Sequence, residues 1–178
     1  MSHPKQRQFC ERVKAKFPEY FKAKWVIDIG SLDVNGNNRG MFTDCTYIGI
    51  DLGPGPNVDI VAPAHELTVI QFDTVVSTEA LEHDPFYRQT LAHVAMRLLK
   101  PKGLFLFTCA TYGRPKHGTN EYSPGDSKYT NNHYANLGGQ DIRDAIDIEL
   151  FFDQWAFETD EAHHDLYFWG IKRGNDDI

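Results

Sequence analysis

Short apolar runs, separated by polar or glycine-rich positions, recur through the first two thirds of the chain. Runs rich in Val, Ile, Phe and Tyr are typical of buried strands, and they occupy residues 25–30, 47–51, 58–61, 72–77 and 104–108. Apolar residues at helical spacing predict helices over residues 4–17 and 86–99, and the Pro-Lys-Gly sequence at 101–103 is expected to stop the second one. Strands that alternate with helices predict an α/β fold around a mostly parallel sheet.

This pattern disappears between residues 111 and 139, which are rich in Tyr, Asn, Gly and His. Loops of this length are usually functional or disordered, and the aromatic content favours an ordered loop on the substrate side. Asp141 is then expected to cap a helix that runs to about residue 148, and late strands are predicted at 155–159 and 165–172. The length of 178 residues suits one domain over 1–178, with an N-terminal helical segment at 1–24.

The charge of the chain argues against one class of partner. Lys and Arg total 18 and Asp and Glu total 25, a formal net charge of −7, whereas proteins that bind the nucleic-acid backbone usually carry a basic patch. No apolar run approaches the roughly 20 residues that cross a bilayer, and the charged N-terminus lacks the apolar stretch of a signal peptide. We therefore expect a cytoplasmic protein without a nucleic-acid or membrane partner, and its oligomeric state stays open.

Metal-binding patterns in the sequence are weak. The three cysteines are scattered and form no CxxC pair, which gives no support to a zinc site or a disulfide framework. His83, His117 and His133 could meet if the long loop folds over the sheet, but they lack close ligand spacing. No metal site is predicted.

Polar side chains stand where the predicted strands end. Asp28 and Gly30 close the first strand, Asp51 closes the second, and Ser77 to Glu79 follow the fourth. The carboxyl ends of parallel strands meet at one edge of the sheet, where ligands bind in such folds. A glycine there lets backbone N–H groups approach a ligand closely, and an acid after the second strand can accept hydrogen bonds from both hydroxyls of a ribose. These positions predict a nucleoside ligand.

The loop after the first strand separates two kinds of nucleoside ligand. A dinucleotide site uses G-x-G-x-x-G to seat a pyrophosphate, but the glycines here are Gly30, Gly36 and Gly40, with Asp33 among them. A carboxylate at that place repels a diphosphate and suits an ammonium or sulfonium cation. The loop therefore favours an adenosyl amino acid over NAD, and an NAD-dependent oxidoreductase is the less favoured alternative.

Four segments carry a resemblance to a known family. In chain order they read VIDIGSLDVNG, YIGIDLGPGPNVDIVAPAHEL, FDTVVSTEALEHDP and LKPKGLFLFTCAT. Together they resemble the class I S-adenosylmethionine-dependent methyltransferases, above all the small domains with an LEH sequence after the fourth strand. The resemblance covers about residues 25–111. It implies a Rossmann-like, seven-stranded, mostly parallel sheet with helices on both faces and a last antiparallel strand.

The same resemblance implies a cofactor, S-adenosyl-L-methionine, with S-adenosyl-L-homocysteine as its product. Asp28, Gly30 and Ser31 would line the methionine part, while Asp51 would hold the ribose and Leu52 would pack on the adenine. The other expected cofactor-binding residues are Asp33, Asn35, Gly36, Arg39, Ala64, His65, Ser77, Thr78 and Glu79. Among these, Arg39 is expected to pair with the cofactor carboxylate, and Ala64 and His65 to meet the adenine edge.

Two positions depart from the family's pattern. Leu32 stands where members often carry a second glycine, and Pro63 stands where they often carry an acid that accepts from the adenine amino group. Either the cofactor is held more weakly or another group reaches the amine. A non-catalytic protein that binds S-adenosylmethionine or S-adenosylhomocysteine is therefore a second alternative.

Methyl transfer requires a nucleophile aligned with the sulfonium methyl group. An oxygen acceptor usually loses its proton during the attack, which favours a nearby histidine or carboxylate. His83 and His117 are the candidate catalytic residues, because both follow strands whose ends should border the crevice. The only spare segment is the 111–139 loop, so we expect a small-molecule acceptor such as a sugar or metabolite hydroxyl.

Overall fold

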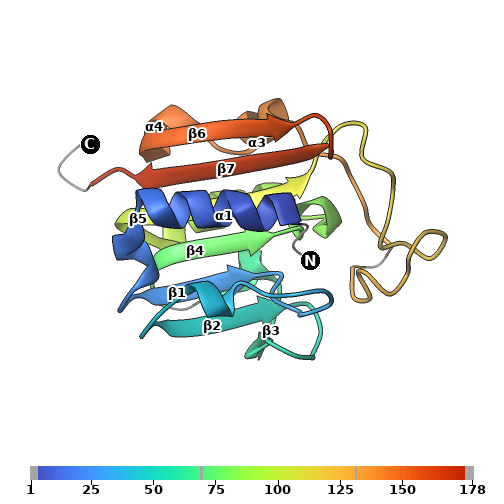
Figure 1. Cartoon of the computed structure of the whole chain (residues 1–178), viewed down its shortest axis with the longest axis horizontal. Helices are drawn as coiled ribbons and strands as arrows, with labels where there is room; N and C mark the ends of the chain where they lie inside the picture. The colour runs from blue at the N-terminus through green and yellow to red at the C-terminus, as the bar shows by residue number, and fades with distance from the viewer. Residues whose placement is uncertain (1–3, 69, 131, 175–178) are drawn as a thin grey trace.

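A seven-stranded sheet runs through the computed structural model, which describes residues 4–68, 70–130 and 132–174 (Figure 1). Positions 1–3, 69, 131 and 175–178 of the predicted domain lie outside the described residues. Among these, positions 1–3 belong to the predicted N-terminal segment and position 131 to the predicted long loop. The strands are β1 (Trp25–Ile29), β2 (Thr46–Asp51), β3 (Ile60–Val61), β4 (Phe72–Thr78), β5 (Leu99–Ala110), β6 (Phe152–Asp160) and β7 (Asp165–Lys172). Their order is β3-β2-β1-β4-β5-β7-β6. Only the pairs that β7 makes with β5 and β6 are antiparallel among these, so the predicted fold class is confirmed.

Short helices connect the strands and cover both faces of the sheet. The α-helices are α1 (Pro4–Lys16), α2 (Tyr87–His93), α3 (Gly139–Ala145) and α4 (Ile148–Phe151). Single turns are η1 (Pro18–Phe21), η2 (Arg39–Met41), η3 (Ala64–Glu66) and η4 (Leu81–His83), and the wider turn η5 (Val94–Leu98) continues α2. In Figure 1, α1 lies across the face of the sheet that is turned toward the viewer.

The alternation of side chains along each strand builds two apolar cores, one on each face. Leu106 of β5 packs in the cluster that includes Phe9 of α1, while Phe105 and Phe107 pack in the opposite cluster with Leu91 of α2. Burying a large apolar side chain contributes roughly 1.5–3 kcal/mol. A slip of one residue would exchange the two faces, so this burial fixes the register of the sheet.

Three element boundaries differ from the sequence prediction. The third strand is only Ile60–Val61, because Val58 is held in a turn by its N–H bond to the Gly55 carbonyl at 3.2 Å. The second helix ends at Leu98, and the Pro-Lys-Gly sequence lies inside β5. Asp141 caps a helix as predicted, but from within its first turn: α3 starts two residues before Asp141 and ends at Ala145, short of the predicted residue 148. Asp141 sits in its first turn, where its carboxylate accepts the Gly138 N–H at 2.8 Å.

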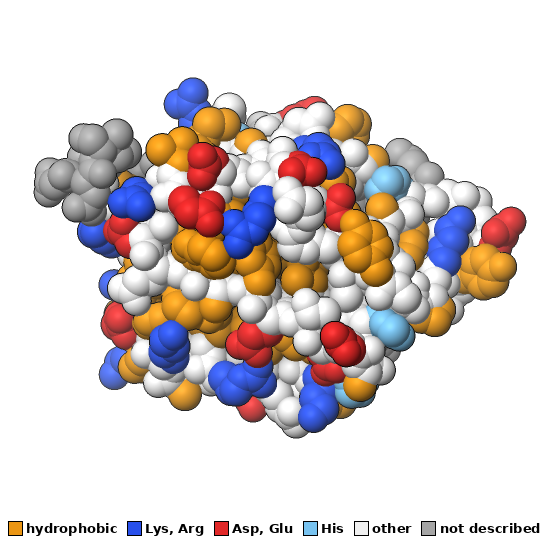
Figure 2. Space-filling view, turned by 90° about the horizontal axis from the view of Figure 1, so that it is seen from above, with side chains coloured by type: hydrophobic (Ala, Val, Ile, Leu, Met, Phe, Trp, Pro, Cys, Tyr) orange, Lys and Arg blue, Asp and Glu red, His pale blue; other side chains and the backbone are white. Residues whose placement is uncertain are grey.

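The surface carries charges of both signs. Acidic and basic side chains are interspersed on the face in Figure 2, without a large patch of one sign. Within the described ranges, no helix has the length and apolar character needed to cross a bilayer.

The order of the strands determines where a ligand can bind. The chain moves outward from β1 to β3, then returns to add β4 on the other side of β1. At such a reversal the connections after the two central strands diverge, which opens a crevice beyond their carboxyl ends.

Candidate functional site

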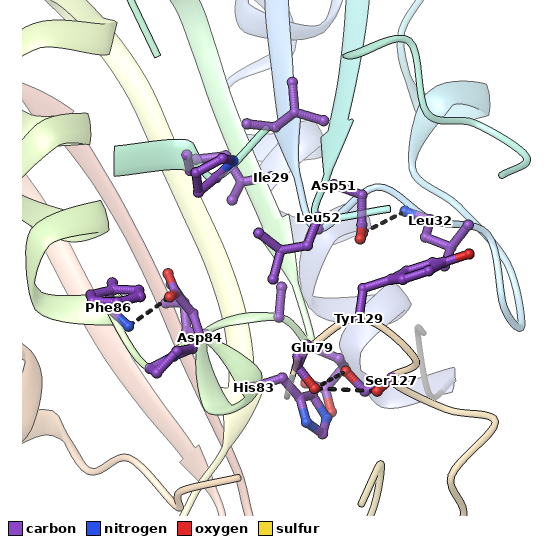
Figure 3. Close-up of a pocket in the computed structure, with 18 of the residues that line it drawn as sticks. Ile29, Leu32, Asp51, Leu52, Glu79, His83, Asp84, Phe86, Ser127 and Tyr129 are labelled. Atoms are coloured by element: carbon purple, nitrogen blue, oxygen red, sulfur yellow. Dashed lines mark hydrogen bonds between the residues drawn. The ribbon is translucent and has the colours of Figure 1, made fainter. Parts of the chain in front are cut away.

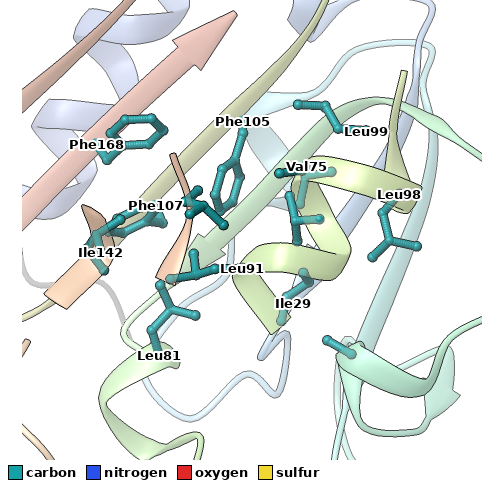
Figure 4. Packing of buried hydrophobic residues seen from close by; sticks show 14 of the residues in the cluster. Ile29, Val75, Leu81, Leu91, Leu98, Leu99, Phe105, Phe107, Ile142 and Phe168 are labelled. Atoms are coloured by element: carbon teal, nitrogen blue, oxygen red, sulfur yellow. The ribbon is translucent and has the colours of Figure 1, made fainter. Parts of the chain in front are cut away.

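A cavity of about 470 Å³ lies at this crevice, a size typical of small-molecule sites. The ends of β1 and β2, the turns η3 and η4, and part of the long loop form its walls. Figure 3 shows Asp51 and Leu52 toward one end, and His83 and Ser127 at the other. Beneath it, Ile29 and Leu81 belong to the core cluster drawn in Figure 4, which ties the walls to the packed interior.

The turn after β1 requires glycine at one position. Gly30 has a φ of +75°, and a Cβ placed on it would lie 2.2 Å from the Cβ of Ala80. The N–H groups of Gly30 and Ser31 both donate to the carbonyl of Ile50, at 2.9 Å. Glycine therefore lets β1 turn sharply at the cavity, with its backbone close to the segment after β4.

Asp51 brings a carboxylate to the cavity from the end of β2. Its Oδ2 accepts the N–H of Leu32 at 3.1 Å, and burial raises the pKa of the Asp51 carboxyl above its usual 3.8. The neighbouring Leu52 lines the same cavity although it is 39% exposed. A half-buried acid beside an accessible apolar side chain can bind a polar ring substituent and an apolar ring side by side.

The turn η3 supplies the opposite wall through Ala64 and His65. The ring of His65 lies 4.7 Å from the ring of Phe86, between centroids. The Nδ1 of His65 is buried and has no hydrogen-bond partner among the described residues. A buried polar atom without a partner is costly, and the residue that carries this nitrogen lines the cavity.

Glu79 follows β4 and lines the middle of the cavity. Its φ is +54°, and its carboxylate accepts the hydroxyl of Thr108 at 3.1 Å. Burial, followed by the nearby charge of Glu82, raises the pKa of Glu79 well above its usual 4.5. Arg114 lies 3.9 Å away.

Six predicted cofactor-binding residues are not among the described residues that line the cavity. Each contacts other parts of the protein or is exposed; they are Asp28, Asp33, Asn35, Gly36, Ser77 and Thr78. Asp28 accepts hydrogen bonds from Tyr47 and Asn38, and burial raises its pKa to about 7. Asp33 accepts from the Gly36 N–H at 2.7 Å and from Asn37 at 2.6 Å.

Ser31 and Arg39 also lie outside the described cavity lining. Arg39 donates to Asp59 at 2.6 Å and to Asn57 at 2.7 Å. The hydroxyl of Ser31 donates to the Asn57 carbonyl at 3.1 Å. The predicted residues that the structure does bring together at the cavity are Gly30, Asp51, Leu52, Ala64, His65, Glu79 and His83.

His83 and His117, the candidate catalytic residues, lie against each other with ring centroids 5.0 Å apart. Tyr134 packs on both rings, at 5.4 and 4.8 Å. Burial lowers the pKa of His83 to about 4 and lowers that of His117. His133 meets His83 through its carbonyl oxygen, 3.4 Å from the His83 Nδ1.

The long loop closes one side of the cavity. Its residues 126–130 line the cavity, and the Tyr129 hydroxyl donates to the Pro54 carbonyl at 3.4 Å. Glycine is needed opposite this ring, because a Cβ on Gly53 would lie 2.1 Å from Tyr129. Sequence reasoning missed these residues and also Phe86. The aromatic content of the loop was the available signal, but it does not say which ring faces the cavity.

No protein-family model and no curated protein matches the sequence. The structure is similar to solved methyltransferases. The 1,6-didemethyltoxoflavin-N1-methyltransferase of Burkholderia thailandensis, solved with 1,6-didemethyltoxoflavin and S-adenosylhomocysteine, shares 15% identity at a TM-score of 0.59, over 97% of this chain and 92% of that one. The N-methyltransferase NodS of Bradyrhizobium japonicum, solved with S-adenosylhomocysteine, shares 13% at 0.62, over 97% and 89%.

A third similar structure is a longer protein. Phosphoethanolamine N-methyltransferase 2 of Haemonchus contortus, solved with S-adenosyl-L-methionine, shares 16% identity at a TM-score of 0.65, over 94% of this chain and 52% of that one. The antiparallel β7 between β5 and β6 differs from the strand order 3-2-1-4-5-6 of dinucleotide-binding folds. At these identities the likeness establishes the fold.

Proposed function

We propose that this chain, whose fold is that of the class I methyltransferases, is an S-adenosylmethionine-dependent methyltransferase that acts on a small acceptor. The observation that carries the proposal is the convergence of Gly30 and Asp51 on one cavity beyond the carboxyl ends of β1 and β2. A close backbone turn and a ribose-binding acid are the two features that an adenosyl ligand needs at this edge of a sheet.

The residues of the cavity fit the adenosyl group. The Asp51 carboxylate would accept hydrogen bonds from the ribose hydroxyls, and Leu52 and Phe86 offer apolar surface for the adenine. The Nδ1 of His65, which has no partner among the described residues, would accept a hydrogen bond from the adenine amino group. It would take the role of the acid that the family often carries at the position of Pro63. When bound, the cofactor supplies an electrophilic methyl group on a positively charged sulfur.

The charges that line the cavity favour such a cation over a diphosphate. Asp51, Glu66, Asp84 and Asp126 are acidic residues of the described lining, against one lysine, Lys128. The carboxylate of Asp33, on which the sequence argument relied, is instead engaged by its own loop. The acidic character of the proposed site therefore depends on other residues.

The acceptor would lie at the loop end of the cavity, near His83. Residues 126–130 line this end, which limits its room and favours a small acceptor. We propose that His83 and His117 accept the proton that an acceptor hydroxyl loses, since their rings lie together beside this end. A sugar or metabolite hydroxyl stays the proposed acceptor class, and the cytoplasm stays the proposed compartment.

The direct test is transfer of a labelled methyl group from S-adenosylmethionine into a fractionated metabolite extract. The proposal predicts a labelled small product with the unmodified chain, and far less of it with Asp51→Ala at a cofactor concentration near the Kd of the unmodified chain. The variant Asp44→Asn changes an exposed acid outside the cavity and should label the product as the unmodified chain does. Tight binding of S-adenosylhomocysteine without labelling of any extract would favour the non-catalytic alternative.

A further inference from the structure

Glu82, His83 and His117 form a cluster of metal-ligating side chains beside the cavity. One ligand atom from each residue lies within 4.8 Å of the others. Glu82 and His83 come from η4 and His117 comes from the long loop, so the cluster joins two distant segments. Glu82 is completely buried and His83 is 5% exposed. The sequence predicted no metal site because the histidines lack close ligand spacing along the chain.

Both imidazoles are oriented as metal ligands usually are. The Nδ1 of His83 lies 3.4 Å from the His133 carbonyl, and the Nδ1 of His117 lies 3.1 Å from the Pro115 carbonyl. A carbonyl oxygen only accepts, so each Nδ1 carries the proton and each Nε2 carries a free lone pair. Ligating histidines commonly donate their other N–H to a backbone carbonyl in this way.

Among the described residues, no basic side chain forms a salt bridge with the carboxylate of Glu82. Its Oε1 accepts the Ala110 N–H at 3.3 Å, whereas its Oε2 is buried without a hydrogen-bond partner among the described residues. The nearby Arg114 pairs with Asp165 at 2.5 Å and approaches Glu79 at 3.9 Å. Burying an ionised carboxylate without a partner is costly, and a bound cation would remove that cost.

We propose that Glu82, His83 and His117 bind one divalent first-row transition-metal ion at the loop end of the cavity. Imidazole and carboxylate ligands together suit Zn²⁺, Mn²⁺ and related ions. Ligand atoms about 2.1 Å from one ion in tetrahedral geometry lie about 3.4 Å apart, so binding requires ligand atoms that now lie up to 4.8 Å apart to approach by up to roughly 1.4 Å. The loop already comes close: a Cβ on Gly118 would lie 2.6 Å from the ring of His83.

The proposed site has an open coordination position. Three protein ligands are typical of catalytic sites, in which water or substrate takes a further position. His83 lines the cavity, so an acceptor oxygen there can reach the ion. This role rests on the proposed methyltransferase function: an ion lowers the pKa of an oxygen bound to it, and the two imidazoles then act as ligands instead of proton acceptors.

The test is calorimetric titration of the full chain with Zn²⁺ and with Mn²⁺, after removal of metal with a chelator. We expect one ion per chain. Glu82→Gln and His117→Asn each remove a direct ligand, so each should weaken binding more than about 100-fold, beyond the effect of losing an outer-shell partner. His164→Asn is the matched control: it removes an imidazole at a φ of +55°, which Asn tolerates, and should bind as the unmodified chain does.

Two outcomes would overturn the site: stoichiometric uptake of neither ion, or unchanged affinity in His117→Asn, whose partly exposed side chain makes misfolding a poor explanation. Thermal unfolding gives a second readout, since Zn²⁺ should stabilise the unmodified chain and not Glu82→Gln. Equal stabilisation of both chains by Zn²⁺ would likewise count against Glu82 as a ligand. Titration of the metal-free chain with S-adenosylhomocysteine separates the metal proposal from the proposed function. Cofactor binding does not require the ion, so the metal-free chain should still bind S-adenosylhomocysteine if only the metal proposal fails.

Discussion

Removal of the Asp51 carboxylate perturbs the most specific contact of the proposed cofactor complex. In that complex two ribose hydroxyls donate to the carboxylate, which already accepts the Leu32 N–H at 3.1 Å. A hydrogen bond to a charged group contributes about 1.5–3 kcal/mol, so the loss of two costs roughly 3–6 kcal/mol. Asp51 is still partly exposed to solvent, so each ribose hydrogen bond partly replaces one to water, which favours the low end. A loss of about 3 kcal/mol weakens binding roughly 100-fold.

Calorimetric titration with S-adenosylhomocysteine measures this loss directly. Asp51→Ala should bind roughly 100-fold more weakly, and Asp51→Asn, which keeps one accepting oxygen, about tenfold more weakly. Asp44→Asn should bind as the unmodified chain does. The ionised form of Asp51 accepts the hydroxyls, and its pKa is raised by burial. Affinity should therefore fall as the pH falls through that pKa, in the unmodified chain but not in Asp51→Asn. An affinity for Asp51→Ala within about threefold of the original, less than 1 kcal/mol, would refute the reasoning.

Three further predictions concern the walls of the cavity and its support. Gly30→Ala places a Cβ 2.2 Å from that of Ala80 and should lower the urea midpoint of unfolding. Adding Ala80→Gly should restore the stability except for the left-handed backbone cost of about 1–2 kcal/mol. A Gly30→Ala chain as stable as the unmodified chain would contradict this. Burial raises the Asp28 pKa from 3.8 to about 7, so the folded chain binds a proton that the unfolded chain releases, and stability on the order of 4 kcal/mol is lost as the pH rises between those values. Asp28→Asn should flatten that part of the pH–stability curve measured by urea unfolding, and an unchanged slope would speak against the shift. His65→Phe should reduce by about tenfold the ratio of the affinities for S-adenosylhomocysteine and for its inosine counterpart, because one hydrogen bond of about 1.4 kcal/mol is lost. A ratio equal to that of the unmodified chain would remove His65 from the adenine site.

The parts of the fold that the sequence predicted are those with a local signature. Apolar runs ending in Asp or Gly predicted the central strands, and Asp51 reaches the cavity because it ends β2. The number of strands and the antiparallel direction of the last one followed from the family resemblance, whereas the strand order came from the structure. Short elements were less predictable in their bounds: Asp141 caps α3 as expected, but it does so from the first turn, by accepting the Gly138 N–H.

The site was predicted less completely because side chains choose partners that no local pattern reveals. Asp33 lies in the loop after β1 as expected, but neighbouring donors turn its carboxylate onto its own backbone. Arg39 is held by Asp59, twenty positions away. Glu82 and Tyr129 become important only when the long loop folds back over the end of the sheet. Such contacts depend on the path of the chain in space and not on spacing along it.

The most direct measurement of the central claim is a crystal structure of the chain with S-adenosylhomocysteine. The account predicts the adenosine in the 470 Å³ cavity, with its ribose hydroxyls on Asp51, its amino group on His65 and its sulfur toward the end of β4. A cavity without ligand density at saturating concentration, or a nucleoside bound elsewhere on the chain, would contradict it.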